Sequence, residues 1–236
     1  LIYINNRKSG YIEYYNRHNS NLPSNNIYSI ISDGYGGLWV ASLEYLLHFD
    51  IDKRNFTIVD VDEDGHKLQQ YNRLLFCDSK KRIWAGGEMG ISVFNQVGTS
   101  LLPNTDFQIA SVLKQAFVNC FYETSSGYLW IGTRNGLFAL KESDKQFLQY
   151  TTENGLPSNV IYGILEDAYG RLWISTNQGL SCLNPESGKF RNFTIMDGLQ
   201  GNQFNAGAYC RKDNGYMLFG GVNGITSFRP ETLIDN

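Results

Sequence analysis

The four tryptophans of this chain recur at nearly constant spacing. They are Trp39, Trp84, Trp130 and Trp173, and successive pairs are separated by 45, 46 and 43 residues. A further step of 45 residues leads to Leu218, which stands in a similar segment. The sequence therefore predicts five repeated units in register. The residue six positions after each of these anchors is glycine in four units and tyrosine in the first: Tyr45, Gly90, Gly136, Gly179 and Gly224.

Each unit has the pattern of β-strands joined by tight turns. In the fourth unit a strand at 159–165 leads into an Asp-x-x-Gly turn from Asp167 to Gly170, followed by the tryptophan strand, a glycine turn, a third strand and an aromatic strand at 190–193. Short alternating runs bounded by Gly, Asn and Asp indicate strands, and the period of two excludes helical repeats. Four strands in about 45 residues are typical of a β-propeller blade, so we predict an all-β propeller.

Composition excludes several classes of protein. The 236 residues carry 20 Lys and Arg against 23 Asp and Glu, a formal net charge of -3, so no basic excess favours nucleic acid. No apolar run approaches the ~18 residues of a membrane span. The chain opens at Leu1 inside a repeat with no targeting signal, so we interpret it as a fragment. The four cysteines lack zinc-type spacing and are expected to be small buried hydrophobic residues: Cys77, Cys120, Cys182 and Cys210.

The units resemble the two-component-regulator propeller repeat. The family pattern is Leu-Pro-x-Asn, a strand, then Asp-x-x-Gly-x-Leu-Trp-Ile-Gly-Thr, x-x-Gly-Leu and an aromatic strand. Residues 156–180 match it nearly throughout, and residues 22–39 match it equally well. The departures are Lys81 at the turn glycine, Thr124 at the turn aspartate and Leu218 at the tryptophan. Residues 198–236 look like the last repeat before the family's C-terminal immunoglobulin-like domain.

The resemblance implies a sensor. It implies about five and a half blades of a seven-bladed propeller, forming part of the periplasmic region of a hybrid two-component histidine kinase of the inner membrane, as in Bacteroidetes. It further implies an oligosaccharide ligand, a homodimeric full-length receptor, no cofactor, and no contact of this fragment with nucleic acid or membrane. The predicted segments are 1–18 (end of one blade), the blades 19–63, 64–110, 111–152 and 153–197, and the last blade 198–236.

The recurring anchors, Leu218 included, are expected to be buried, and the turn aspartates are expected to be structural. A tryptophan at one phase of an apolar strand suits packing between blades better than a sugar platform. Asp33, Asp78 and Asp167 lie at turns, where their carboxylates accept backbone N–H bonds, whereas calcium needs six or more converging oxygens. The three histidines show neither metal-binding nor triad spacing. We predict neither a metal site nor catalytic residues.

Binding is expected where the repeat varies between fixed positions, because loops carry function on a rigid scaffold. The residues four and five positions after each anchor form such a rim, and the link entering each first strand should lie on the same face, adding 66–69, 104–106 and 202–205. Amides suit sugar hydroxyls, and Arg134 can hold a uronate or sulfate; alternatively it pairs with Glu88. The candidate ligand-binding residues are Glu44, Glu88, Arg134, Asn135, Asn177, Gln178 and Asn223.

Two other functions remain open from the sequence. Glu44 and Glu88 occupy the same rim position in adjacent units, and paired carboxylates serve as acid and base in glycosidases. The first alternative is therefore a carbohydrate-active lyase or hydrolase on a propeller, although no catalytic motif accompanies the pair. The second is a protein-binding propeller scaffold.

Overall fold

The computed structural model describes residues 2–6, 11–42, 44–59, 72–104, 111–114, 116–141 and 146–233. Their regular structure is almost entirely antiparallel β-strand, with short 3-10 turns at Thr152–Asn154, Ile195–Asp197 and Pro230–Thr232. The chain divides into an N-terminal unit, residues 1–115, and a C-terminal unit, residues 116–236.

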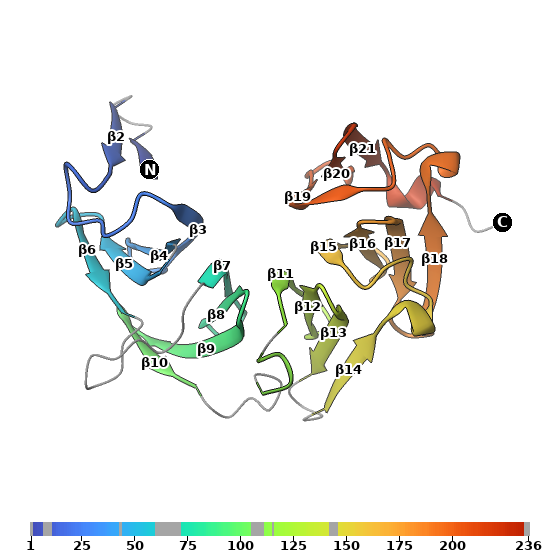
Figure 1. Ribbon diagram of the computed structural model, residues 1–236, viewed down its shortest axis with the longest axis horizontal. Helices are drawn as coiled ribbons and strands as arrows, with labels where there is room; N and C mark the ends of the chain where they lie inside the picture. Colours follow the sequence, from blue (N-terminus) through green and yellow to red (C-terminus); the bar gives the residue numbers. More distant parts are fainter. Residues whose placement is uncertain are drawn as a thin grey trace. The chain divides into compact units, whose positions relative to one another are not determined.

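The N-terminal unit contains a hairpin and two four-stranded sheets (Figure 1). Each sheet is a simple meander in which every strand pairs antiparallel with the next along the chain. The hairpin is β1 (Ile2–Asn6) and β2 (Tyr11–Tyr15); the first sheet is β3 (Ile27–Ser32), β4 (Leu38–Ser42), β5 (Leu46–Asp50) and β6 (Asn55–Ile58); the second is β7 (Asn72–Cys77), β8 (Arg82–Gly87), β9 (Gly90–Val97) and β10 (Ser100–Pro103).

The C-terminal unit contains two four-stranded meanders and one three-stranded meander (Figure 1). These sheets are the blade-type units that the repeat predicts, and only the last one has three strands over the described residues. The strands are β11 (Val118–Glu123), β12 (Leu129–Thr133), β13 (Gly136–Lys141) and β14 (Gln146–Tyr150); β15 (Ile161–Glu166), β16 (Leu172–Thr176), β17 (Gly179–Asn184) and β18 (Lys189–Phe193); and β19 (Phe204–Arg211), β20 (Met217–Gly221) and β21 (Gly224–Phe228).

The anchors occupy one register position in all five sheets, as predicted. Trp130 on β12 lies opposite Ala139 on β13, and Trp173 on β16 lies opposite Cys182 on β17. The two strands are joined by a turn that ends in glycine, and Gly136 and Gly179 adopt positive φ angles of 117° and 114°. Side chains other than glycine rarely adopt this conformation, which explains the glycine six residues after each anchor.

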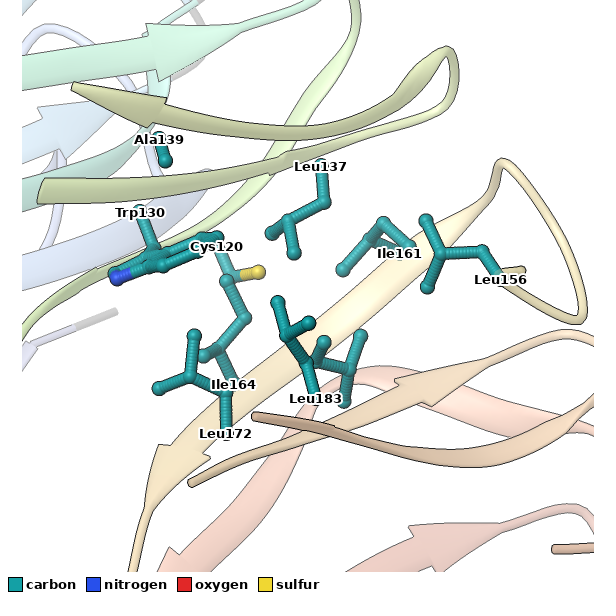
Figure 2. Packing of buried hydrophobic residues seen from close by; sticks show 10 residues of the cluster. Cys120, Trp130, Leu137, Ala139, Leu156, Ile161, Ile164, Leu172 and Leu183 are labelled. Atoms are coloured by element: carbon teal, nitrogen blue, oxygen red, sulfur yellow. The ribbon is translucent and has the colours of Figure 1, made fainter. Parts of the chain in front are cut away.

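Three of the anchor tryptophans, Trp39, Trp130 and Trp173, pack against the next sheet of their own unit. Trp130 and Cys120 contact Ile161, Ile164 and other apolar residues of the β15–β18 sheet (Figure 2). All four tryptophans are at most 2% exposed, so their predicted role in the core is confirmed. Burial of side chains of this size is the main favourable term in sheet stacking.

Leu218 does not share this burial. It is only half-buried, contrary to the prediction, although it occupies the anchor position opposite Ser227. Met217 and Phe219, on the opposite face of the β19–β21 sheet, contact the preceding sheet. Within the described residues no further sheet covers the face that carries Leu218. The cysteine prediction fails at the same place: Cys120 and Cys182 are buried and Cys77 is half-buried, but Cys210, which pairs with Leu218, is exposed.

The Asp-x-x-Gly turns are held by the aspartate side chain, as predicted. Asp167 Oδ1 accepts the backbone N–H groups of Tyr169 and Arg171, and Asp78 Oδ1 likewise accepts those of Lys80 and Arg82. The other carboxylate oxygen reaches into the core, where it accepts the indole N–H of the anchor at 2.9 Å for Trp173 and 2.8 Å for Trp84. Asp78 and Asp167 therefore each tie their turn to the tryptophan of the same sheet.

Candidate functional site

The seven predicted binding residues lie at one end of their own sheets, in the turns between second and third strands. In the first two sheets of the C-terminal unit these turns are built alike. The Thr176 hydroxyl donates to the Gly179 carbonyl at 2.8 Å and accepts the Gln178 backbone N–H at 3.0 Å. The Thr133 hydroxyl makes the same two bonds with Gly136 and Asn135. A fixed turn therefore presents the variable side chains to solvent.

The turns of the C-terminal unit lie against the link that enters the next sheet. The Gly136 N–H donates to the Asn159 carbonyl at 2.8 Å, and the Gly179 N–H donates to the Asn202 carbonyl at 2.6 Å. This confirms that link and turn share one face in this unit. The predicted link residues 66–69, 105 and 106, and also Leu43 at one rim position, lie outside the described residues.

Arg134 is exposed and rests on an aromatic ring. Its guanidinium carbon lies 3.8 Å from the centroid of the Phe117 ring, and its backbone N–H donates to the Phe117 carbonyl at 3.0 Å. Stacking on a ring limits the rotamers of the side chain and leaves the N–H groups at the edge of the guanidinium plane. Such a cation is preorganised to bind a carboxylate or sulfate in a bidentate manner.

Asn177 and Asn223 differ in their surroundings. The side-chain oxygen of Asn177 is buried and has no hydrogen-bond partner, whereas Gln178 beside it is exposed. Asn223 is exposed, and its backbone N–H donates to the Gln200 side chain at 2.8 Å. A buried acceptor without a donor is costly, so Asn177 is the rim residue best placed to gain from a donor supplied by a ligand.

In the N-terminal unit the rim carries an ion pair that sequence reasoning missed. Glu88 Oε1 lies 2.6 Å from Arg73 Nη2, and the Arg73 guanidinium lies 5.1 Å from the centroid of the Tyr28 ring. Arg73 therefore adds a second cation close to a rim position. Arg73 lies on β7, the first strand of its sheet. The rim predicted from the sequence comprises only turn and link residues, so it does not include Arg73. Glu44 is exposed.

Three pockets lie at the opposite end of the sheets, near the aspartate turns. None of the seven predicted residues lines them. Their volumes are about 390 Å³ between β5–β6 and β9–β10, about 250 Å³ between the β11–β14 and β15–β18 sheets, and about 210 Å³ along β16–β18. The first two form where neighbouring sheets meet, so a repeat pattern read within one blade does not reveal them.

The turn aspartate of the first sheet, Asp33, bonds a histidine instead of the tryptophan of its own sheet. Asp33 Oδ2 lies 2.8 Å from His48 Nε2, and the Trp39 indole donates instead to Gln96 on β9 at 3.3 Å. Burial alone would raise the pKa of the Asp33 carboxyl, but the bonds from His48 and from the backbone of Tyr35 and Gly37 outweigh it and hold this pKa below its usual value.

Comparison with known proteins identifies the repeat. A family model described as "Two component regulator propeller" matches residues 21–44, 113–135 and 155–178, each segment ending at the rim turn of its unit. Three segments of this chain match the two-component regulator propeller repeat. The three matched repeats contain Trp39, Trp130 and Trp173, so the all-β propeller fold class is confirmed, while the number of blades in the complete ring stays a prediction.

Proteins similar to these propeller repeats occur in signalling systems. A curated protein named Histidine kinase P4, from Formosa agariphila, is 29% identical over 195 residues, which are 79% of this chain and 14% of that protein. The extracellular domains of the hybrid two component systems BT3049 and BT4673 from B. thetaiotaomicron superpose with TM-scores of 0.73 and 0.69. Their identities are 22% and 18%, and the alignments cover 87% and 88% of this chain and 28% and 30% of those chains.

The propeller repeats supply neither a membrane helix nor a metal cluster within the part of the chain that the structure describes. No helix there is long and apolar enough to cross a membrane. No three His, Cys, Asp or Glu side chains of the described residues come together as a metal site would require.

Proposed function

We propose that this chain is part of the extracytoplasmic, ligand-sensing propeller of a two-component sensor histidine kinase, and that an oligosaccharide binds its rim. The observation that carries the proposal is the pair of like-built turns in the C-terminal unit, which present Arg134, Asn135, Asn177 and Gln178 at one end of successive sheets. Asn223 occupies the same position in the turn of the β19–β21 sheet. The similarity to a histidine kinase and to extracellular sensor domains supports the assignment.

The chemistry of the rim suits an acidic or neutral saccharide. Amide side chains donate to and accept from hydroxyl groups, and the Asn177 side-chain oxygen has no hydrogen-bond partner within the chain. Arg134, held over Phe117, pairs with a uronate or sulfate. The amides of this rim are therefore proposed to orient the sugar, and Arg134 is proposed to select a sugar that carries a negative charge.

Binding without bond cleavage is the mechanism that we infer. The ligand shifts the equilibrium between two arrangements of the receptor dimer, and it does so only by binding one arrangement more tightly than the other. Glu88 Oε1 lies 2.6 Å from Arg73 Nη2, so this carboxylate is already occupied by an ion pair within the chain.

Calorimetry on the intact extracytoplasmic region tests this function, with tetrameric oligouronates and neutral gluco-oligosaccharides as probes. We expect at least one probe to bind, and the double substitution Arg134→Ala and Asn177→Ala to weaken its affinity at least tenfold. Arg191→Ala is the matched control, because Arg191 is an exposed arginine on the outer strand β18. Unchanged affinity in the double variant contradicts the rim site, and chain shortening of a probe that is lost in Glu88→Gln contradicts the sensor mechanism.

A further inference from the structure

The pocket of about 250 Å³ lies between the β11–β14 and β15–β18 sheets, at the end opposite the rim. It is contained within the C-terminal unit, and both sheets contribute to its wall. The lining residues that determine its chemistry are Tyr128, Trp130, Tyr150, Glu166, Tyr169 and Glu186.

A difference between blades explains the character of this pocket. Beside Trp84 and Trp173, an arginine guanidinium lies 5.7 and 5.9 Å from the indole ring and its Nε donates to the turn aspartate. Beside Trp130 both charged groups are replaced, because Thr124 stands at the aspartate position and Tyr128 at the arginine position. The charged pair that accompanies the indole in those two blades is therefore absent from this one.

The same replacement leaves a buried donor without an acceptor. Trp130 is 2% exposed, and its indole N–H has no hydrogen-bond partner. Figure 2 shows the indole nitrogen directed away from the aliphatic side chains of the core. The Thr124 hydroxyl does not replace the carboxylate, since it bonds Ser126 and the backbone of Tyr128. An unmade bond of a buried N–H is costly, so an acceptor brought by a ligand would be favourable.

The remaining wall is aromatic and acidic. The Trp130 ring centroid lies 5.9 Å from that of Tyr150 in a stacked arrangement and 6.1 Å from that of Tyr128, while Tyr169 is 69% exposed. The lining residues include Glu166 and Glu186 and neither lysine nor arginine. Carboxylates accept hydrogen bonds and repel anions, and tyrosine rings offer flat apolar faces.

We propose that this pocket is a second ligand site, specific for an uncharged polyhydroxylated ring of about the size of one hexose. A hydroxyl group can bind both the donor and the acceptor of the pocket wall, since it accepts from the Trp130 indole N–H and donates to the Glu166 carboxylate. The volume lies just below the ~300–1,000 Å³ of pockets for drug-sized ligands, which suits a single ring. The indole nitrogen is covered in this structure, so the ligand reaches it by rotation of the half-buried Tyr128 side chain, a change common on binding.

The indole N–H resonances of the four tryptophans test the proposal directly in the ¹⁵N-labelled chain. We expect methyl β-glucopyranoside, added at millimolar concentration, to move the Trp130 signal downfield while the signals of Trp39, Trp84 and Trp173 stay in place. Glucuronate should bind at least tenfold more weakly, because two glutamates line the pocket. A Trp130 signal that does not move up to 50 mM glycoside, or equal shifts of all four signals, overturns the proposal.

Two variants separate binding from folding. Thr124→Asp supplies the missing acceptor from within the chain, so the Trp130 signal should move downfield without ligand and then cease to respond to the glycoside. Tyr169→Ala removes an exposed ring and should weaken binding about three- to tenfold with the four free-state signals preserved. Full binding in both variants contradicts the site, and neither variant alters the rim on which the proposed sensing function rests.

Discussion

Lys81 and Gly170 occupy the same position of equivalent turns, and both have left-handed backbone conformations, with φ of 63° at Lys81 and 74° at Gly170. This conformation costs a residue other than glycine roughly 1–2 kcal/mol. Lys81 is held in it by the turn, in which its backbone N–H donates to the Asp78 carbonyl. Lys81→Gly should therefore stabilise the chain by about 0.5–1 kcal/mol after the greater entropy of unfolded glycine is deducted. The midpoint of urea unfolding measures the change.

The opposite substitution is the control for that prediction. Gly127 has a φ of 80°, and a methyl group on its Cα would meet open space, so Gly127→Ala adds backbone strain without a clash. It should lower stability by about 1 kcal/mol. A destabilising Lys81→Gly would show that the lysine side chain makes a contact worth more than the strain.

Asp167→Thr should destabilise the C-terminal unit by about 2–4 kcal/mol. The substitution copies the residue found at position 124; it removes the acceptor of the buried Trp173 indole and the carboxylate that the Arg171 Nε donates to. Chemical denaturation followed by tryptophan fluorescence measures the loss. Asp213→Thr, an exposed aspartate in a neighbouring turn, should change stability by less than about 0.5 kcal/mol.

The Asp33–His48 pair predicts a specific pH dependence. Because the pKa of Asp33 is lower in the folded chain than its ordinary value of 3.8, the carboxylate contributes stability above pH 3.8, and this contribution is lost as the pH falls through the folded pKa. The difference in unfolding free energy between the native chain and Asp33→Asn should therefore narrow below pH 3.8. A difference that widens with acid would contradict the assignment.

The four thiols should differ sharply in reactivity. Burial raises the pKa of Cys120 to about 12, so at pH 8 only about one thiol in ten thousand is ionised, and Cys210 is exposed. Iodoacetamide should modify Cys210 within minutes and leave Cys120 intact until the chain is unfolded, as judged by peptide mass spectrometry. Rapid modification of Cys120 under native conditions would show that the sheets separate readily.

The strands, the anchors and the role of the turn aspartates could be predicted because each depends on the pattern within one repeat. The Arg73–Glu88 pair and the pockets between neighbouring sheets could not be predicted, because they depend on which side chains neighbouring strands and sheets bring together. Thr124 was visible as a departure from the repeat. Its effect on Trp130 emerged only once the structure showed that the turn aspartate accepts the indole N–H of its own blade.

The bonds from Gly136 to Asn159 and from Gly179 to Asn202 join a turn to the chain 23 residues downstream in both cases. Each tie closes a short loop, so its entropic cost is small, and the contact order of the C-terminal unit stays low. A blade can therefore be fastened to its successor as soon as the next link has been synthesised. We infer that assembly of this unit proceeds from its first blade to its last during translation, with each new blade added to a folded edge.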